Sequence, residues 1–242
     1  AEQLTEIKLP STLEKLGSTV FQNTPIENIS LPEGLREVGS SVFADCKNLK
    51  AVTIPSTIEN ASEMLKNSLV EQLTFADGIV NIPPYIAIDA AALQTVELPR
   101  SVTNLGTRCF ARTNITAFTV PKQIIKADTP FSESALTDIF FEDGLAQIPN
   151  TLLRDAIHLN AIHWNASLTE IGDYCFYNCP ALETVEIPDT IQVIGYEAFR
   201  NCKSIRQLRL PDCAAKIGSF AFAGCTALES VLVPQMATAA DG

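Results

Sequence analysis

The chain has 242 residues, of which 46% are hydrophobic, and its formal net charge is −11. Its 17 Lys and Arg are spread along the sequence without a basic cluster. Binding to nucleic acid or to an anionic membrane is therefore not expected, because both need a positive surface. The sequence also lacks an uninterrupted apolar run of about 18 residues, the length that would span a bilayer.

A repeat of 21 to 23 residues runs through the whole sequence. Its clearest copies are LPSTLEKLGSTVFQNTPI (9–26), IPDTIQVIGYEAFRNCKSI (187–205) and LPDCAAKIGSFAFAGCTAL (210–228). A marker proline recurs at Pro10, Pro32, Pro55, Pro99, Pro121, Pro188, Pro211 and Pro234, and Ala76, Glu142 and Asn165 fill the three gaps. A fixed period of this length indicates stacked units that share one core. We therefore expect a single domain, 1–242, of about eleven repeats.

Each repeat opens with an apolar string, L-x-x-I-x-L/I-P, that predicts a short strand. The strings begin at Leu4, Ile26, Leu49, Val70, Leu93, Ile115, Leu136, Leu159, Leu182, Ile205 and Leu228. Their second half alternates apolar and polar residues, which is typical of a strand with one buried face. The connections are too long for hairpins, so the strands should be parallel. We expect each strand to centre two residues before the marker position.

After the marker position come a turn and an apolar residue followed by Gly. These pairs are Leu16-Gly17, Val38-Gly39, Leu105-Gly106, Ile171-Gly172, Ile194-Gly195 and Ile217-Gly218. Glycine is expected there for backbone angles that other residues avoid. A short helical turn with an inward Phe should follow, at Phe21, Phe43, Phe110, Phe176, Phe199 and Phe222. Helices need more room than strands, so the strand side should be concave.

The segments Leu182–Cys202, Ile205–Cys225 and Leu4–Phe21 resemble BspA-type leucine-rich repeats, L-x-x-I-x-L/I-P-x-x-h-x-x-I-G-x-x-A-F-x-x-C. The resemblance covers essentially the whole chain. Residues 56–92 and 122–158 lose the Gly, the A-F pair and the Cys, but they resemble each other, so we interpret them as repeat variants. The expected fold is α/β: a right-handed leucine-rich repeat solenoid with a parallel sheet on its concave face and short helical turns on its convex face.

Most of the seven cysteines occupy repeat positions. Cys46, Cys179, Cys202 and Cys225 share one slot, and Cys109 and Cys175 share another. A cysteine fixed in one slot suits packing, because it is small and apolar. Neighbouring coils are close enough for a disulfide, but their side chains should point in parallel. We expect seven free thiols.

No catalytic or metal-binding constellation stands out. The two histidines, His158 and His163, lack a neighbouring Ser or Cys with a third orienting group. Cys175 and Cys179 have no second pair at finger spacing. A column of Asp77, Asp143, Asp189 and Asp212 is open to calcium, but solvated turn residues are the favoured interpretation. We expect no enzyme activity, no cofactor and no metal.

The outward strand positions are mostly small and polar, with one exception. Phe140 should lie beside His163, near small residues and a pair of opposite charges. The candidate contact patch comprises Asp138, Phe140, Ala161, His163, Thr184, Glu186, Gln207 and Arg209. The alternative is that Phe140 is simply a tolerated exposed apolar residue. Trp164 is not part of the patch, since it fills a core slot.

The resemblance implies a non-enzymatic interaction or adhesion module at the bacterial cell surface. Its partner would be a host or matrix protein or a glycan, bound through the concave sheet. The alternative is a rigid spacer domain of a larger surface protein. A secreted or surface location implies that a signal peptide, absent from this sequence, has been removed. Both ends look uncapped, so we expect a fragment of a longer protein or end-to-end self-association.

Overall fold

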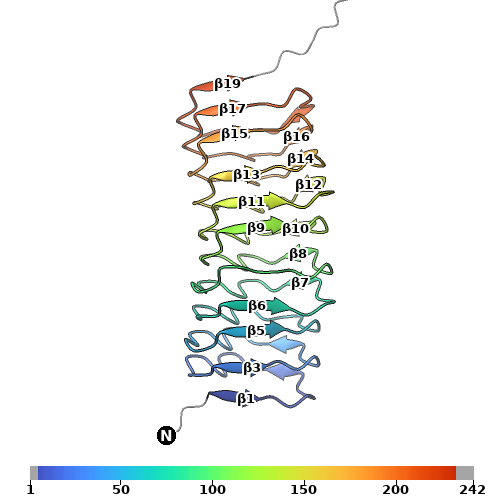
Figure 1. Ribbon diagram of the computed structural model, residues 1–242, viewed down its shortest axis with the longest axis vertical. Helices are drawn as coiled ribbons and strands as arrows, with labels where there is room; N and C mark the ends of the chain where they lie inside the picture. Colours follow the sequence, from blue (N-terminus) through green and yellow to red (C-terminus); the bar gives the residue numbers. More distant parts are fainter. Residues whose placement is uncertain (1–4, 233–242) are drawn as a thin grey trace, which may run out of the picture.

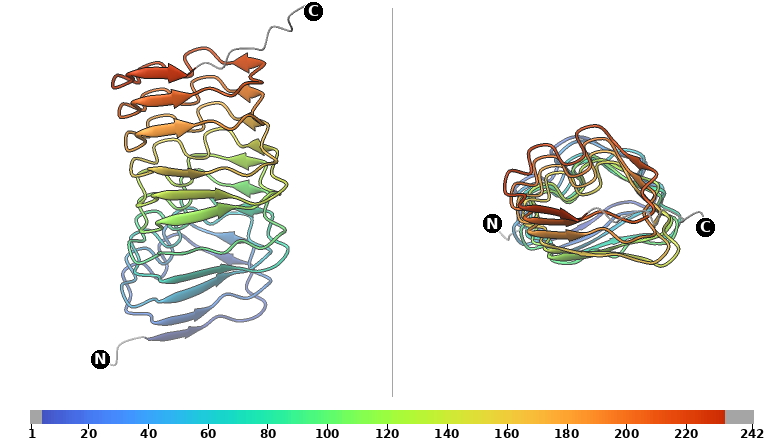
Figure 2. Two further views of the ribbon diagram at one scale, coloured as in Figure 1. Left: turned by 45° about the horizontal axis from the view of Figure 1, so that its top comes forward. Right: turned by 90° about the horizontal axis from the view of Figure 1, so that it is seen from above.

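The chain winds into a column of about ten coils, each running from one apolar string to the next (Figure 1). The computed structural model describes residues 5–232, and all regular elements in that range are short strands. Residues 5–232 form no helix that could cross a membrane. Seen from above, the coils outline a rounded triangle (Figure 2), so the column has three sides. We name them the strand face, the second ladder and the turn face.

The strand face is built from the strands that the apolar strings predict. They are β1 (Glu6–Lys8), β3 (Asn28–Ser30), β5 (Ala51–Ile54), β6 (Gln72–Phe75), β9 (Ala117–Val120), β11 (Asp138–Phe141), β13 (Ala161–His163), β15 (Thr184–Glu186), β17 (Gln207–Arg209) and β19 (Ser230–Leu232). Neighbours that are hydrogen-bonded run parallel, as in Val185 opposite Leu208. The parallel arrangement is thus confirmed, and it follows from the long connections between strands.

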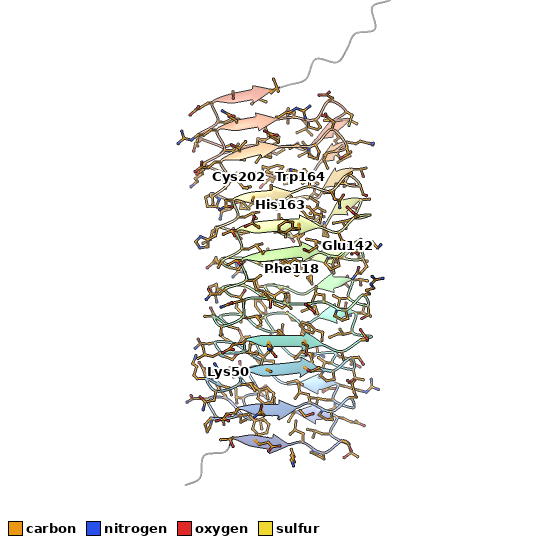
Figure 3. The ribbon with its side chains drawn as sticks, in the orientation of Figure 1. Lys50, Phe118, Glu142, His163, Trp164 and Cys202 are labelled. Carbon is orange, nitrogen blue, oxygen red and sulfur yellow. The ribbon has the colours of Figure 1, made fainter. Side chains whose placement is uncertain are left out.

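Side chains on the strand face alternate as the sequence predicts. In β5, Val52 and Ile54 are buried, whereas Ala51 and Thr53 are exposed. Trp164, expected in a core slot, is partly buried and packs against Phe141, with ring centroids 6.2 Å apart. Figure 3 labels Trp164 next to His163, its exposed neighbour in the chain. The register derived from the repeat is therefore correct.

The ladder of the strand face differs from the prediction in three respects. The string at Leu93 forms only a single bridge, from Val96 to Leu73, and no strand. Strand centres lie up to one residue earlier than expected, as in β3, which centres on Ile29. In the described part of the chain, pairing is interrupted between β3 and β5, between Val96 and β9, and between β13 and β15. Leu4 and Pro234, with the tail behind it, lie outside the described residues.

The second ladder was not foreseen from the sequence. It consists of two-residue strands: β2 (Lys15–Leu16), β4 (Glu37–Val38), β7 (Asn81–Ile82), β8 (Asn104–Leu105), β10 (Lys126–Ala127), β12 (Gln147–Ile148), β14 (Glu170–Ile171), β16 (Val193–Ile194) and β18 (Lys216–Ile217). These strands also pair in parallel, as in β14 with β16. Two residues are too few to show the alternation that marks a strand in sequence.

The turn face replaces the helical turns that we expected, and this expectation was wrong. Each coil there holds two residues with positive φ, four positions apart, such as Tyr174 (55°) and Asn178 (57°). A right-handed helix excludes such angles. The backbone amides instead donate to the next coil, as from Phe176 to the carbonyl of Ala198 at 2.7 Å. The described residues are therefore all-β, not α/β.

The absence of helices from residues 5–232 also changes the expected shape. Curvature was predicted because helices take more room than strands, but here both the strand face and the turn face are spaced by hydrogen bonds between coils. The coils consequently stack into an upright column in Figure 1, not a horseshoe. The strand face is therefore one side of this column and not the inside of a curved slab.

Glycine follows the second ladder for a reason other than the one predicted. Gly195 does not have a positive φ. A Cβ atom at Gly195 would lie 2.6 Å from the backbone nitrogen of Asp173 and from the backbone carbon of Gly172 in the preceding coil. Glycine is required because two backbones approach closely there, not because of an unusual backbone angle.

One cluster of buried apolar side chains runs along the column from Ile26 to Ala221. Inside it the Phe rings stack, with the centroids of Phe176 and Phe199 only 4.8 Å apart. Residues of the weak stretches, such as Ile86 and Leu152, belong to the same cluster. This agrees with the interpretation of 56–92 and 122–158 as repeat variants.

The slot cysteines add hydrogen bonds between coils. The Cys202 thiol donates to the carbonyl of Phe176 at 3.0 Å, and the Cys179 thiol donates to that of Leu153 at 3.2 Å. All seven cysteines carry free thiols, and Cys213 is the exposed one. Burial raises the pKa of the Cys225 thiol to about 12, so this thiol stays protonated at neutral pH.

Candidate functional site

The strand face carries a stacked aromatic pair at Phe140 and His163. Their rings lie parallel, with an interplanar angle of 3° and centroids 4.1 Å apart. The stack follows from register, because Phe140 of β11 lies directly opposite His163 of β13. Phe140 is 38% exposed, so the pair is open to solvent despite the stack. Figure 3 labels His163 on this face of the column.

Asp138 fixes the orientation of the imidazole. His163 Nε2 lies 2.9 Å from Asp138 Oδ1, and the Thr137 hydroxyl donates to the other carboxylate oxygen at 2.8 Å. The contact to His163, and after it the contact to Thr137, holds the pKa of the Asp138 carboxyl below its usual range. The carboxylate is therefore ionised at neutral pH and acts as an acceptor for the imidazole N–H.

The other predicted patch residues form a second group on β15 and β17. Thr184 lies opposite Gln207, and Glu186 lies opposite Arg209. The hydrogen bonds of Arg209 go to other carboxylates, however: it donates to Asp189 at 3.0 Å and to Asp212 at 3.3 Å. The Arg209 guanidinium, with the amide of Asp212, holds the pKa of the Asp189 carboxyl below its usual range.

The structure does not join these two groups into one sheet. Within the described residues β13 and β15 form no ladder, and Figure 1 shows them farther apart than β15 and β17. A hollow of about 560 Å³, lined by Asn160, Ala181, Glu183, Thr184 and Ser204, lies at this interruption. Asp138, Phe140, Ala161 and His163 therefore form one compact patch, and the residues of β15 and β17 lie beside it.

The two histidines have different surroundings in the described part of the chain. His163 has an aspartate partner, and His158 is exposed in a turn before β13. Neither imidazole is hydrogen-bonded to a Ser or Cys side chain within residues 5–232. In the same range, His, Cys, Asp and Glu side chains do not gather in groups of three or more that could hold a metal ion.

A second cluster, on the turn face, was missed by sequence reasoning. It comprises Arg154, Tyr174, Tyr177, Tyr196, Arg200 and Phe220. The available signal was the concentration of Tyr and Phe in the turns of the last repeats, at positions that other repeats mostly fill with polar or small residues. Because those positions were assigned to a helical turn, their common exposure was not recognised.

These geometries define the chain as a repeat solenoid with exposed aromatic side chains on its strand face and its turn face. The sequence matches the family model described as BspA type leucine rich repeat region (6 copies), over residues 1–87, 62–154 and 127–241. Since the three overlapping ranges span nearly the whole sequence, the chain belongs to the BspA-type leucine-rich repeat family. No curated protein matches the sequence.

One solved structure has the same fold over most of this chain. A leucine-rich repeat protein from Bacteroides ovatus ATCC 8483 is 21% identical, with a TM-score of 0.71 over 94% of this chain and 66% of that one. A leucine rich cell surface protein from Faecalibacterium prausnitzii A2-165 is also 21% identical, over 93% of this chain and 84% of that one, with a TM-score of 0.39. The chain thus spans about two thirds of the length of the Bacteroides protein.

Proposed function

We propose that this chain is a non-enzymatic interaction module of a secreted or cell-surface bacterial protein, and that it binds through the Phe140–His163 pair. The observation that carries the proposal is the parallel ring stack, held at 4.1 Å and anchored by Asp138. Side chains that are already ordered lose little conformational entropy on binding. Family membership and the naming of a neighbour as a cell surface protein support the location.

The surroundings of the pair support the same proposal. Phe140 is flanked on β9 by Thr119, which is exposed, and the neighbouring outward positions Ala117 and Ala161 are small. A large aromatic pair beside small side chains projects above the sheet, where a partner can reach it. Exposed aromatic side chains that no part of the fold covers commonly mark interaction sites. The partner class that we propose is a host or matrix protein or glycan.

The test is an array of immobilised host extracellular proteins and glycans, probed with the labelled chain. Phe140→Ala combined with His163→Ala should reduce the bound signal at least tenfold. The control is Ser30→Ala, an exposed position in β3 at the same slot as His163. If the unaltered chain, the double variant and Ser30→Ala all bind equally, the Phe140–His163 pair has no role in binding. A melting temperature that drops by more than about 5 °C in the double variant would place Phe140 in the core, since surface changes usually stay within about 0.5 kcal/mol.

A rigid spacer remains a second candidate, because one observation favours it. Backbone hydrogen bonds join neighbouring coils on the strand face, in the second ladder and on the turn face. A column linked on three sides resists bending and can hold another domain at a fixed distance. If the array stays empty for the unaltered chain at micromolar concentration, the spacer function is favoured over binding.

A further inference from the structure

The ten coils provide ten versions of the same turn-face surface, and they can be compared with one another. The first positive-φ position is occupied by Thr19, Ser41, Glu63, Tyr85, Arg108, Thr129, Thr151, Tyr174, Glu197 and Phe220. Within residues 5–232, several aromatic and arginine side chains touch on the turn face only in the later coils, in the turn-face cluster defined above. Tyr and Arg are the side chains that dominate binding energy at protein interfaces.

The rings of the cluster hold one another in place. Tyr174 and Tyr196 meet edge to face with centroids 5.3 Å apart, and Tyr196 meets Phe220 in the same way at 6.1 Å. The Tyr177 hydroxyl accepts a hydrogen bond from the Asn201 amide at 3.2 Å. Edge-to-face pairs favour a single arrangement of the rings. The surface is therefore ordered before any partner arrives.

Stability of the fold does not explain the aromatic residue in the last of these coils. Phe220 is 59% exposed and has a φ of 60°. A bulky side chain is strained in this region of φ. Burial of the Phe220 ring offsets little of this strain, because more than half of the side chain stays in water. Because every coil has a positive φ at this position, it is the exposure of the aromatic ring that favours contact with a partner.

Arg154 indicates what that partner presents. Its guanidinium lies over the Tyr177 ring, 4.8 Å from the centroid, and 5.5 Å from that of Tyr174. Among residues 5–232 it donates no hydrogen bond, and its closest carboxylate oxygen, on Asp155, is 3.6 Å away. Arg200, by contrast, is bound to Glu197 at 2.8 Å. Arg154 thus offers a flat, oriented set of donors, which matches a carboxylate.

We propose that the turn-face cluster is a second docking surface, and that it binds an acidic and apolar segment of another protein. A carboxylate of the segment is held by Arg154, and apolar side chains next to it pack on Tyr196 and Phe220. This surface lies on a different side of the column from the Phe140–His163 pair. The two surfaces can therefore act independently, and either one can fail without the other.

A phage-displayed library of random twelve-residue peptides, selected on the immobilised chain, tests this proposal. The selected peptides should contain Asp or Glu next to aromatic or aliphatic residues. Their affinity should fall at least tenfold with Arg154→Ala and with Phe220→Ala. It should be unchanged with Arg108→Ala and Tyr85→Ala, which remove an arginine and a tyrosine from the same face of earlier coils. Phe140→Ala should also leave it unchanged.

Three outcomes would overturn the proposal. Peptides dominated by Lys and Arg would show that the surface selects the opposite charge. Affinity that is insensitive to Arg154→Ala and Phe220→Ala would place binding elsewhere. If no peptide is selected and the chain instead binds a glycan, and if Arg154→Ala and Phe220→Ala abolish that binding, the ligand of the turn-face cluster is a sugar. Phe220→Ala should keep the melting temperature of the unaltered chain, because the ring is largely exposed, and Tyr196→Phe provides a milder second variant.

Discussion

Truncation of Phe199 tests the stacked core most sharply. Phe199 is fully buried and lies between two parallel rings, with centroids 4.8 Å from Phe176 and 5.3 Å from Phe222. Phe-to-Ala changes in cores cost about 3–5 kcal/mol, and each aromatic pair adds about 0.5–1.5 kcal/mol beyond burial. Because Phe199→Ala breaks two such pairs, we expect a loss of about 4–5 kcal/mol.

The measurement is urea unfolding followed by the fluorescence of Trp164, the only tryptophan, which contacts Phe176. Phe222→Ala is the matched control, because Phe222 is only partly buried and, within residues 5–232, its ring stacks on that of Phe199 alone. It should cost clearly less than Phe199→Ala. A loss below about 2 kcal/mol for Phe199→Ala, or equal losses for the two variants, would refute the stacked core, since buried Phe truncations cost more than that.

Three further results are expected. Gly195→Ala should destabilise the chain by about 1–3 kcal/mol through overpacking, whereas Gly17→Ala, where a Cβ has 3.6 Å to its nearest neighbour, should have almost no effect in the same unfolding assay. The Arg112 guanidinium lowers the pKa of the Asp89 carboxyl in the folded chain. The pair therefore stabilises the fold fully above the pKa of an unfolded Asp, near 4, and this stabilisation is lost as the pH falls through the lowered pKa of the folded state. The stability advantage of the unaltered chain over Asp89→Asn, about 1 kcal/mol or less, should accordingly be present at pH 7 and vanish near pH 2; an advantage that persists at pH 2 would contradict the ion pair. Titration of the thiols in denaturant without reductant should count seven, and a lower count would show that cysteines pair between coils.

The repeat and its register could be predicted from the sequence, because they rest on a period that recurs many times. The inward Phe199 and the outward Phe140 both follow from that register. The helical turns could not be excluded, since a short segment that buries a Phe and its apolar neighbours suits a helical turn and a non-helical turn equally. What decides between them is the backbone hydrogen bond from one coil to the next, which no single repeat reveals.

One signal in the sequence did point to the turns. The second positive-φ position is mostly Asn or Asp, as at Asn23, Asp45 and Asn178, and these residues tolerate left-handed angles better than most. The Phe140–His163 contact was predictable as a pair opposite in register. The hydrogen bond between Asp138 and His163 runs diagonally from β11 to β13 and depends on side-chain rotamers, so the sequence could not show it.

Photocrosslinking from the strand face tests the central claim most directly. Phe140 is replaced by p-benzoylphenylalanine, and the chain is irradiated on an array protein or glycan that it binds. The same replacement at Ser30, and at Tyr196 on the turn face, provides the comparison. The account predicts crosslinks to that ligand from position 140 and none from position 30. Crosslinks only from position 30 or position 196 would contradict binding through the Phe140–His163 pair.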